Sequence, residues 1–505
     1  MAVLEQLSQY QWYFLGVFLL GLIIHQYRQW ARLSAFKGPL LGTFTNLWLP
    51  CAILTRRCHL KFDEVNEKYG PLARIGSNLL VTNDPELLIR MSSPKSNYTK
   101  APWYHGSRIQ PGHDNVFSSD NEKFHTERKV QLVPGYSGKG NEHLTPSIDS
   151  HVQNLIHLIR SKYVSTDKES RPMDLSRKAQ YFTLDVITDI AYGQPMGDLV
   201  DDDDVYKYIQ STEEMLEVII LLGSMPILND ILKVQWIAEL MFPSEKDQTG
   251  IGRLIGISKQ LVSERFGPKA VQRRDMLGSF IEHGVPEASL VSESLLQILA
   301  GSDTSATVIR ATMLYLLTNP SVYRRLQAEI DDAAHEGRIS RPVVTDTEAR
   351  ALPYLQAVIK EGLRIYPAVT GALTKVVPPE GDTVTLSATN ETVFLPGGTE
   401  IGYNAWGVHR SRAVFGADAD VFRPERWLIP DGTELARMLR SLELVWGYGK
   451  YQCLGRQVAM IELNKVFVEL FRNFDFALCD PTKPWTSLNV GLWIQRDEWV
   501  KVTAR

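Results

Sequence analysis

Residues 446–455 read Trp-Gly-Tyr-Gly-Lys-Tyr-Gln-Cys-Leu-Gly, and the rest of the chain is best interpreted outward from this stretch. It places one cysteine, Cys453, between closely spaced glycines. Glycines let backbone N–H groups approach a sulfur atom, because no Cβ stands in the way. Residues 456–471 have the apolar period of a helix, and N–H groups at a helix start lower the pKa of a nearby thiol. On these residues alone, Cys453 is either a buried structural cysteine on a turn or a thiolate ligand in a dry pocket.

The same stretch resembles the haem-thiolate signature of the cytochrome P450 family, Phe-x-x-Gly-x-Arg-x-Cys-x-Gly. Gly449, Cys453 and Gly455 match that pattern. Trp446 stands where the family has Phe and would shield the sulfur. Tyr451 stands where the family usually has Arg or His, so the charge that pairs with a haem propionate is missing there. The resemblance implies that Cys453 is the axial ligand of the iron of haem b.

A long helix is predicted over residues 293–318, and it contains Ala300-Gly301-Ser302-Asp303-Thr304. A glycine inside a helix costs about 1 kcal/mol relative to alanine, so Gly301 should have a reason. Small residues at 300 and 301 would open a groove for dioxygen, and Ala300 shares a helix face with Thr304. The run matches the family's Ala/Gly-Gly-x-Asp/Glu-Thr motif. The resemblance implies that Thr304 donates a hydrogen bond beside the iron and that Asp303 relays protons. Without it, a helix with incidental small polar residues would be the preferred interpretation.

A structural network is expected around Glu361, which lies three residues before Arg364 on a predicted helix. The run Phe-Arg-Pro-Glu-Arg-Trp at 422–427 resembles the family's Pro-Glu-Arg-Phe stretch. The resemblance implies that Arg426 joins Glu361 and Arg364 in a buried network that is stable only if every charge is satisfied.

The haem propionates lack their usual arginine partners. His125 and Lys129, four residues apart, stand where the family has Trp-x-x-x-Arg on a long helix. A register one residue earlier would use Phe124 and Arg128 instead, and a basic solvated helix face is a third interpretation. Lys375 also stands where Arg is usual. We therefore expect His125, Lys129, Lys375 and, in the other register, Arg128 to hold the propionates.

Composition limits the choice of function. With 505 residues, 44% of them apolar, the chain has ample material for one large core. A net charge of −4 leaves no basic surplus to neutralise phosphates, which argues against nucleic acid as a partner. The four cysteines have neither metal-finger spacing nor a disulfide framework, which fits a reducing, cytosol-facing compartment.

An N-terminal membrane anchor is predicted from the apolar run between Trp12 and Ile24. The run is shorter than the about 20 residues of a full span, but aromatic residues flank it. Arg28, Arg32 and Lys37 follow it, and this bias predicts that the body faces the cytosol. A cleaved signal peptide would need a basic start and a small-residue cleavage site, and this sequence has neither. A buried core helix remains an alternative interpretation of the run. We expect an anchor and linker at 1–36, a catalytic domain at 37–505, and a single-pass protein of the endoplasmic reticulum membrane.

Other segments have simpler interpretations. Residues 72–82 predict a strand pair with a Gly-Ser-Asn turn, and Asp84-Pro85 predicts a helix start. Residues 100–118 predict a loop, 367–377 a strand, and 487–499 a hairpin whose tip enters a pocket. Residues 216–222 and 227–242 are unusually apolar, and the resemblance implies a lid over the pocket there that touches the membrane.

The resemblance extends over essentially the whole chain and implies a mainly α fold with a small β-rich lobe. The amino-acid sequence at residues 114–117 and 135–139 resembles that of fungal enzymes similar to pisatin demethylase. A monooxygenase is implied that uses dioxygen and NADPH electrons from a separate membrane-bound reductase. Its substrate would be an apolar small molecule of secondary metabolism, which the enzyme would hydroxylate, epoxidise or demethylate. Two alternatives are a haem-thiolate isomerase or dehydratase and a non-catalytic haem sensor, and neither explains an intact Asp303-Thr304 pair.

Overall fold

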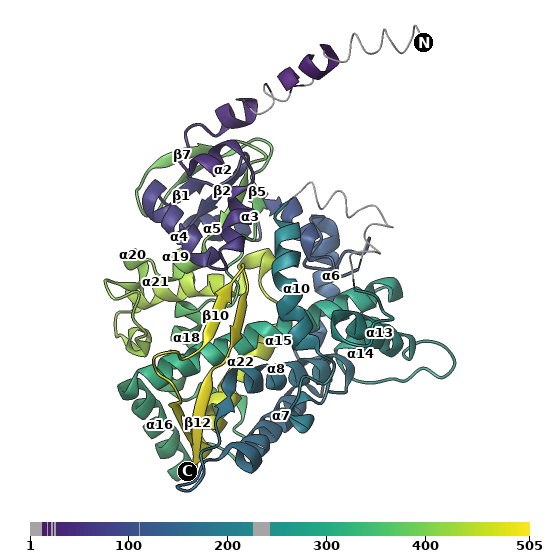
Figure 1. Ribbon diagram of the computed structural model, residues 1–505, viewed down its shortest axis with the longest axis vertical. Coiled ribbons are helices and arrows are strands. Elements are labelled where there is room, and N and C mark those ends of the chain that lie inside the picture. The colour runs from purple at the N-terminus through teal and green to yellow at the C-terminus, as the bar shows by residue number, and fades with distance from the viewer. Residues whose placement is uncertain (1–12, 18, 22–23, 25–26, 111, 226–242) are drawn as a thin grey trace.

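The computed structural model describes residues 13–17, 19–21, 24, 27–110, 112–225 and 243–505. Figure 1 shows a helical body with a smaller β-rich lobe at one end, beyond which the N-terminal segment projects. The mainly α fold with a small β-rich lobe is therefore confirmed.

The helical body is built from long helices joined by short turns. In chain order its helices are α6 (Glu122–Tyr136), α7 (Leu144–Leu158), α8 (Leu175–Tyr192), α9 (Asp198–Asp201), α10 (Tyr208–Gly223), α13 (Gly250–Ser263), α14 (Met276–Glu282), α15 (Glu287–Thr318), α16 (Pro320–His335), α17 (Asp346–Arg350), α18 (Pro353–Ile365), α20 (Arg412–Phe415), α21 (Gly432–Leu442) and α22 (Arg456–Asn473). Short η turns lie at Pro102–Ser107, Ile159–Tyr163, Pro424–Leu428, Glu443–Trp446 and Gly449–Tyr451.

The β-rich lobe holds a five-stranded sheet in the order β1-β2-β8-β5-β3 and the hairpin β6-β7. Its strands are β1 (Leu72–Arg74), β2 (Leu79–Thr82), β3 (Thr99–Lys100), β5 (Lys375–Val376), β6 (Asp382–Thr385), β7 (Thr392–Leu395) and β8 (Glu400–Tyr403). Helices α2 (Leu40–Phe44), α3 (Trp48–Leu54), α4 (Cys58–Tyr69), α5 (Pro85–Ser92) and α19 (Ala405–His409) accompany the sheet. The predicted strand pair at 72–82 is confirmed, with Ala73 opposite Val81.

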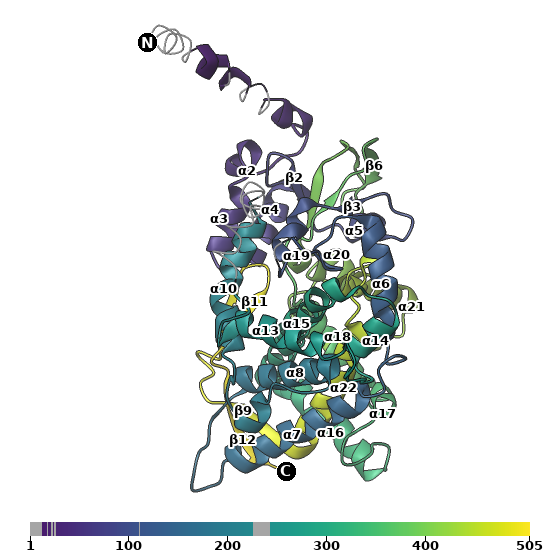
Figure 2. The same ribbon diagram turned by 90° about the vertical axis from the view of Figure 1, so that its right-hand side faces the viewer.

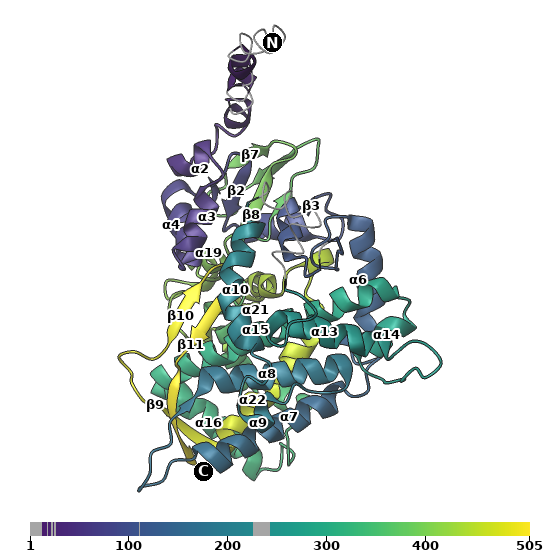
Figure 3. The ribbon, with the colours of Figure 1, turned by 45° about the vertical axis from the view of Figure 1, so that its right-hand side comes forward.

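The C-terminal strands lie against the helical body. The sheet β4-β12-β9 joins β4 (Met173–Asp174), β12 (Trp499–Ala504) and β9 (Phe474–Leu478), and the hairpin pairs β10 (Thr486–Asn489) with β11 (Trp493–Arg496). Figure 3 shows this hairpin close to α10. Its turn contains Gly491, whose φ of +114° suits glycine.

Helix α15 is the axis of the body. Figure 2 shows it in the middle of the helices, and α8, α13, α18 and α22 all contact it. It begins at Glu287, directly after Pro286, six residues before the predicted start. The buried serines of the first turns, such as Ser292, hide the apolar period there. The prediction therefore placed the helix correctly but shortened it.

The predicted network around Glu361 is confirmed. Arg364 donates to both carboxylate oxygens of Glu361, at 2.9 and 2.7 Å, and Arg426 donates to Oε1 at 2.9 Å. Trp427, which the prediction did not include, adds a bond from its indole N–H at 2.9 Å. The side chains of Glu361, Arg364 and Arg426 are at most 1% exposed, so this carboxylate is buried and fully paired.

One sequence prediction needs correction here. Residues 367–377 do not form one strand: only Lys375 and Val376 pair in the sheet, and Leu373 has a φ of +41° that strands do not adopt. Asp84 does open α5, where its carboxylate accepts from the N–H of Leu87. The proposed lid residues 227–242 lie outside the described residues.

The predicted anchor falls partly outside the described residues. The described residues between Tyr13 and Arg32 are helical, and most of their large apolar side chains are exposed. Over the part of the chain that the structure describes, no helix is both long and apolar enough to traverse a bilayer.

Candidate active site

A cavity of about 1540 Å³ lies inside the body and reaches the β-rich lobe. Elements far apart in sequence line it: the loop after residue 100, α6, α10, α15, the segment at 368–375, the cysteine loop and the hairpin tip. Among the predicted site residues, it brings together Cys453, Trp446, Thr304, Asp303, Gly301, Ala300, His125, Lys129 and Lys375. Gly491 and Leu492 also line it, so the predicted hairpin tip enters this cavity.

The loop before Cys453 is held by backbone hydrogen bonds and by Lys129. The N–H of Cys453 donates to the carbonyl of Trp446 at 2.7 Å and closes the loop. From α6, the ammonium of Lys129 donates to the carbonyls of Lys450 and Gln452, both at 2.9 Å. Two of its three protons are thus bound to the loop, so Lys129 serves the cysteine loop more than a propionate.

Gly449 has a role different from the one expected. It does not line the cavity; its φ is +55°, and a Cβ there would lie 2.3 Å from the carbonyl oxygen of Ser92. Glycine is therefore required by the loop's packing against the end of α5. Gly455 lies beside the sulfur, where an added Cβ would stand 3.8 Å from Sγ.

The thiol of Cys453 experiences opposing effects. Burial raises its pKa, whereas the N–H groups of Gly455 and Arg456 and the charge of Lys129 lower it. The N–H groups therefore lower the pKa as predicted, but burial outweighs them and the net pKa lies above its ordinary value. A coordinating metal deprotonates such a thiol outright, and the same N–H groups then stabilise the thiolate.

Thr304 and Asp303 face the cavity from the middle of α15. The Thr304 hydroxyl donates to the carbonyl of Ala300 at 2.7 Å, which leaves its lone pairs as acceptors. Asp303 accepts a hydrogen bond from the side-chain N–H of Gln180 on α8. Burial raises the pKa of Asp303 to about 6, and the charge of Arg310 partly offsets this. An acid with a pKa near neutrality can both accept and release protons under physiological conditions.

Gly301 allows two helices to approach closely. A Cβ added to it would lie 2.8 Å from Cγ1 of Ile187 on α8. The expected reason for this glycine was room for dioxygen beside the iron. The structure gives another reason, which is the packing of α8 against α15 at the level of Asp303.

A group of cations lies at one side of the cavity. The ammonium of Lys375 is buried; it donates to the hydroxyl of Tyr104 at 3.2 Å and lies 3.5 Å from the ring centre of Tyr451. Burial and the neighbouring charge of Lys100 lower the pKa of Lys375 well below its ordinary value. In the described part of the chain no carboxylate lies within ion-pair distance of Lys375.

His125 lines the cavity near these lysines. Its Nδ1 is buried and has no hydrogen-bond partner among the described residues. Burial and the nearby lysines, Lys100 first, lower its pKa to about 3, so the ring is neutral. An anion with two or more oxygens would satisfy Lys375 and this ring together.

Lys100 was not foreseen by sequence reasoning. It lines the cavity and donates to the carbonyls of Val116 and Phe117, and burial lowers its pKa to about 7. The only signal was a lysine within the apolar and aromatic run at 98–104. Tyr451 also lines the cavity, but its hydroxyl donates to Glu122.

Arg128 does not reach the cavity. Its guanidinium forms an ion pair of 2.9 Å with Glu293 on α15, and both side chains are buried. The alternative register with Phe124 and Arg128 is therefore wrong: the helix turns His125 and Lys129 toward the cavity, and the charge of Arg128 is already compensated.

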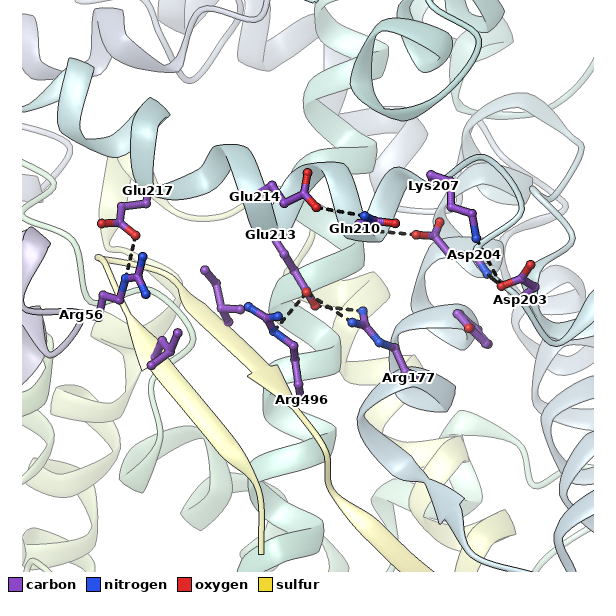
Figure 4. A pocket seen from close by; sticks show the side chains of 13 residues that line it. Arg56, Arg177, Asp203, Asp204, Lys207, Gln210, Glu213, Glu214, Glu217 and Arg496 are labelled. Carbon is purple, nitrogen blue, oxygen red and sulfur yellow. Dashed lines mark hydrogen bonds and ion pairs between the residues drawn. The ribbon is translucent and has the colours of Figure 1, made fainter. Parts of the chain in front are cut away.

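A second, smaller pocket of about 570 Å³ is lined by residues of α8, α10 and the β10–β11 hairpin (Figure 4). Glu213 of α10 binds Arg177 of α8 at 2.9 Å and Arg496 of β11 at 3.2 Å. Glu217, one turn further along α10, pairs with Arg56 at 2.8 Å. These ion pairs fix the helix that contributes Thr212, Met215 and Ile219 to the large cavity.

Comparison with known proteins agrees with this geometry. The cytochrome P450 family model matches residues 38–499. The chain belongs to the cytochrome P450 family. Cytochrome P450 monooxygenase ABA1 of Pyricularia oryzae is 41% identical over 496 residues, which cover 97% of this chain and 95% of that protein. Cytochrome P450 monooxygenase aba1 of Botryotinia fuckeliana is 37% identical over 92% of this chain and 90% of its own length. Cytochrome P450 monooxygenase abl1 of Leptosphaeria maculans is 34% identical over 90% and 80%.

The family implies haem iron, and the residues of the cavity fit that group. A P450 haem needs one thiolate ligand and partners for two carboxylates. The cavity offers the thiol of Cys453, together with the Lys375 ammonium and the His125 Nδ1, which have no ion-pair and no hydrogen-bond partner, respectively, among the described residues. The chain is an oxidoreductase of the P450 monooxygenase type. The finer placement near pisatin demethylase stays a prediction.

Proposed function

We propose that this P450 oxidises an apolar small molecule of fungal secondary metabolism, with Cys453 as the haem ligand and with Asp303 and Thr304 as the proton-handling pair. The observation that carries the proposal is that Cys453, Asp303 and Thr304 all line one cavity of about 1540 Å³. Such a thiolate-bound haem supplies the activation of dioxygen for hydroxylation, epoxidation or demethylation.

The other residues of the cavity have complementary roles in this proposal. Lys375 and His125 would hold the propionates, assisted by the remaining proton of Lys129. The side chain of Trp446 would shield the sulfur, and the N–H groups of Gly455 and Arg456 would stabilise it as a thiolate. Asp303 would accept a proton from solvent and pass it to the Thr304 hydroxyl, because its pKa of about 6 permits both steps.

The lining supports an apolar substrate. The walls away from the cations are mostly aliphatic and aromatic, with Trp103, Phe117, Ile219, Leu299, Val369 and Leu492 among them. An apolar ligand gains from leaving water for such a surface, at roughly 25 cal/mol per Å² of buried area. Electrons would come from NADPH through a separate reductase, as the resemblance implies.

We also propose that the chain is anchored to the endoplasmic reticulum membrane, with the catalytic domain in the cytosol. Exposed apolar side chains support this: Phe14 and Val17 of the N-terminal segment are 71% and 72% exposed, and Leu40 of α2 is 77% exposed. Exposed apolar surface of this kind marks contact with a membrane or a partner. Alkaline extraction of membranes should leave the full chain bound and release a chain that lacks residues 1–36. Equal release of both would contradict the proposal.

The central test is the difference spectrum of the reduced, carbon monoxide-bound protein. We expect the red-shifted Soret band that a thiolate ligand gives, and its loss in Cys453→Ala. Cys479→Ala is the matched control, because that exposed thiol does not line the cavity. A folded wild-type protein without the red-shifted band would refute the oxygenase and favour the haem sensor. Oxidised products, identified by mass spectrometry after feeding candidate apolar compounds to the membranes, would then identify the substrate.

A further inference from the structure

Arg310 is a buried arginine with an unusual set of partners. It lies on α15 two turns after Asp303, is 1% exposed, and forms no ion pair within 4 Å in the described part of the chain. Its guanidinium donates instead to the carbonyl of Ser176 at 2.9 Å and to Oε1 of Gln180 at 2.6 Å. Burying an arginine without a direct counter-ion is costly, so this position should have a reason.

The bond from Arg310 determines the orientation of the Gln180 amide. A guanidinium carries only donors, so the atom that it binds must be the amide oxygen. The amide nitrogen of Gln180 then points to Asp303 and donates to Oδ1 of its carboxylate. Gln180 is 1% exposed and cannot exchange these partners for water. The hydrogen bonds from Arg310 to Gln180 and from Gln180 to Asp303 therefore run in one direction, and the second ends on one oxygen of the Asp303 carboxylate.

We propose that Gln180 and Arg310 are positioning residues for the acid–base group Asp303: they occupy Oδ1 as a hydrogen-bond acceptor, so that Asp303 carries its proton on Oδ2. A carboxylate with one oxygen fixed in this way has a single orientation and a single site for the transferred proton. The inference rests on the proposed function, in which Asp303 handles protons. It adds two residues that lie outside the sequence motifs of the site, and Gln180 belongs to another helix.

Charged residues other than Arg310 also shift the pKa of Asp303. Arg177 on α8 favours the ionised carboxylate and Glu213 on α10 opposes it. These two also pair with each other, and they act on Asp303 in opposite directions. Arg310 is thus the main charge that stabilises ionised Asp303.

Further titratable groups surround this turn of α15. Tyr208 of α10 bonds to Ser302 at 3.2 Å, Glu462 of α22 bonds to Ser305, and Lys259 of α13 lines the cavity. Glu498, before β12, is fully buried; burial raises its pKa well above the ordinary value, and the charge of Arg310 acts in the opposite direction.

The test compares two substitutions at Gln180. Gln180→Met keeps the volume and removes both hydrogen bonds. Gln180→Glu keeps an acceptor for Arg310 but faces Asp303 with a second carboxylate, which raises the proton affinity of the pair. The matched control is Tyr208→Phe, which removes a buried hydrogen bond to the residue before Asp303 and leaves Gln180 in place.

The first measurement is an infrared titration of the Asp303 carboxyl group, assigned by its absence in Asp303→Asn. We expect at least tenfold higher proton affinity for Asp303 in Gln180→Glu, a rise in Gln180→Met, and no change in Tyr208→Phe. The second is the pH profile of product formed per NADPH consumed. Its Asp303-dependent limb should move in the same direction in the two Gln180 variants.

An unchanged Asp303 titration in both Gln180 variants, with lower thermal stability, would overturn the proposal and leave Gln180 as a strut between α8 and α15. If Gln180→Met does not fold, Gln180→Glu decides the matter alone. Failure of the proposed function is recognised separately, because it removes the thiolate spectrum or product of the wild type and leaves the infrared titration unaffected.

Discussion

The ammonium group of Lys129 lies 2.9 Å from the carbonyl oxygen of Gln452, the residue that precedes Cys453. Together with the bond to Lys450, this contact ties α6 to the cysteine loop and places a positive charge near the sulfur. The usual interpretation of a cation at this helix position is a propionate partner. In this chain two of the three ammonium protons are bound to the cysteine loop, and the charge of Lys129 lowers the pKa of Cys453.

Lys129→Met should therefore convert part of the protein to a form without a thiolate ligand. The substitution removes two charge-assisted hydrogen bonds, each worth about 1.5–3 kcal/mol, and a charge that lowers the pKa of Cys453. The ratio of red-shifted to unshifted Soret absorption of the carbon monoxide complex measures the effect. Lys123→Met, on the same helix but exposed, should leave the ratio unchanged. Equal ratios in the two variants would show that Lys129 does not support the thiolate.

Glu361→Gln should prevent the chain from folding stably. It leaves Arg364 and Arg426 buried with an uncompensated charge, at a cost of about 3–5 kcal/mol. Glu336→Gln is the control, because its ion pair with Arg338 is exposed and worth at most about 1 kcal/mol. Soluble yield and the thermal midpoint of both variants decide the point. A midpoint for Glu361→Gln close to that of the control would contradict the network's role.

Gly301→Ala should strain the contact between α8 and α15. The added methyl group would lie 2.8 Å from Ile187, and overpacking of this kind costs about 1–3 kcal/mol. The double variant with Ile187→Ala should recover part of that loss, so that the two changes are not additive. Gly432→Ala on α21 is the control, because nothing lies within 4 Å of its added Cβ. Denaturant unfolding is measured for the wild type, the two single variants, the double variant and the control, and strict additivity would show that this glycine is not required by packing.

The sequence predicted those site residues that lie in a short motif together with their partners. Cys453, Asp303, Thr304 and the pair Glu361 and Arg364 lie within such motifs, and their local spacing is enough to place them. The start of α15 was missed because buried serines interrupt its apolar period. The strand at 367–377 was overextended because a segment that lines a cavity is apolar without pairing in a sheet.

The residues that sequence reasoning missed depend on contacts between distant segments. Lys100 and Lys375 come together through the pairing of β3 with β5, which no local pattern reveals. Gln180 reaches Asp303 only because α8 crosses α15. A basic residue on a helix is likewise ambiguous by sequence: Arg128 and Lys129 are neighbours, and only the partner Glu293 on α15 shows which of them is already compensated.

Lys375→Met should affect the haem-free and haem-bound proteins in opposite directions. In the haem-free chain Lys375 is buried, and among the described residues only the Tyr104 hydroxyl is its hydrogen-bond partner. Replacing it by an apolar side chain of similar length should raise the free energy of unfolding by about 1–3 kcal/mol. If Lys375 binds a propionate, the same change removes a charge-assisted hydrogen bond and should speed haem transfer to an acceptor protein at least tenfold, which corresponds to about 1.4 kcal/mol.

The pH dependence provides an independent check on Lys375. Its pKa in the folded, haem-free chain lies well below the ordinary value of 10.5, so the unfolded chain binds the extra proton between those two values. Haem-free stability should therefore rise as pH increases toward 10.5, and Lys375→Met should lack that part of the rise. Tyr104→Phe keeps the ammonium and should retain it. Haem loss and unfolding that both stay unchanged in Lys375→Met would mean that this lysine is not a propionate partner, and His125 would then have to hold the carboxylates with Lys100.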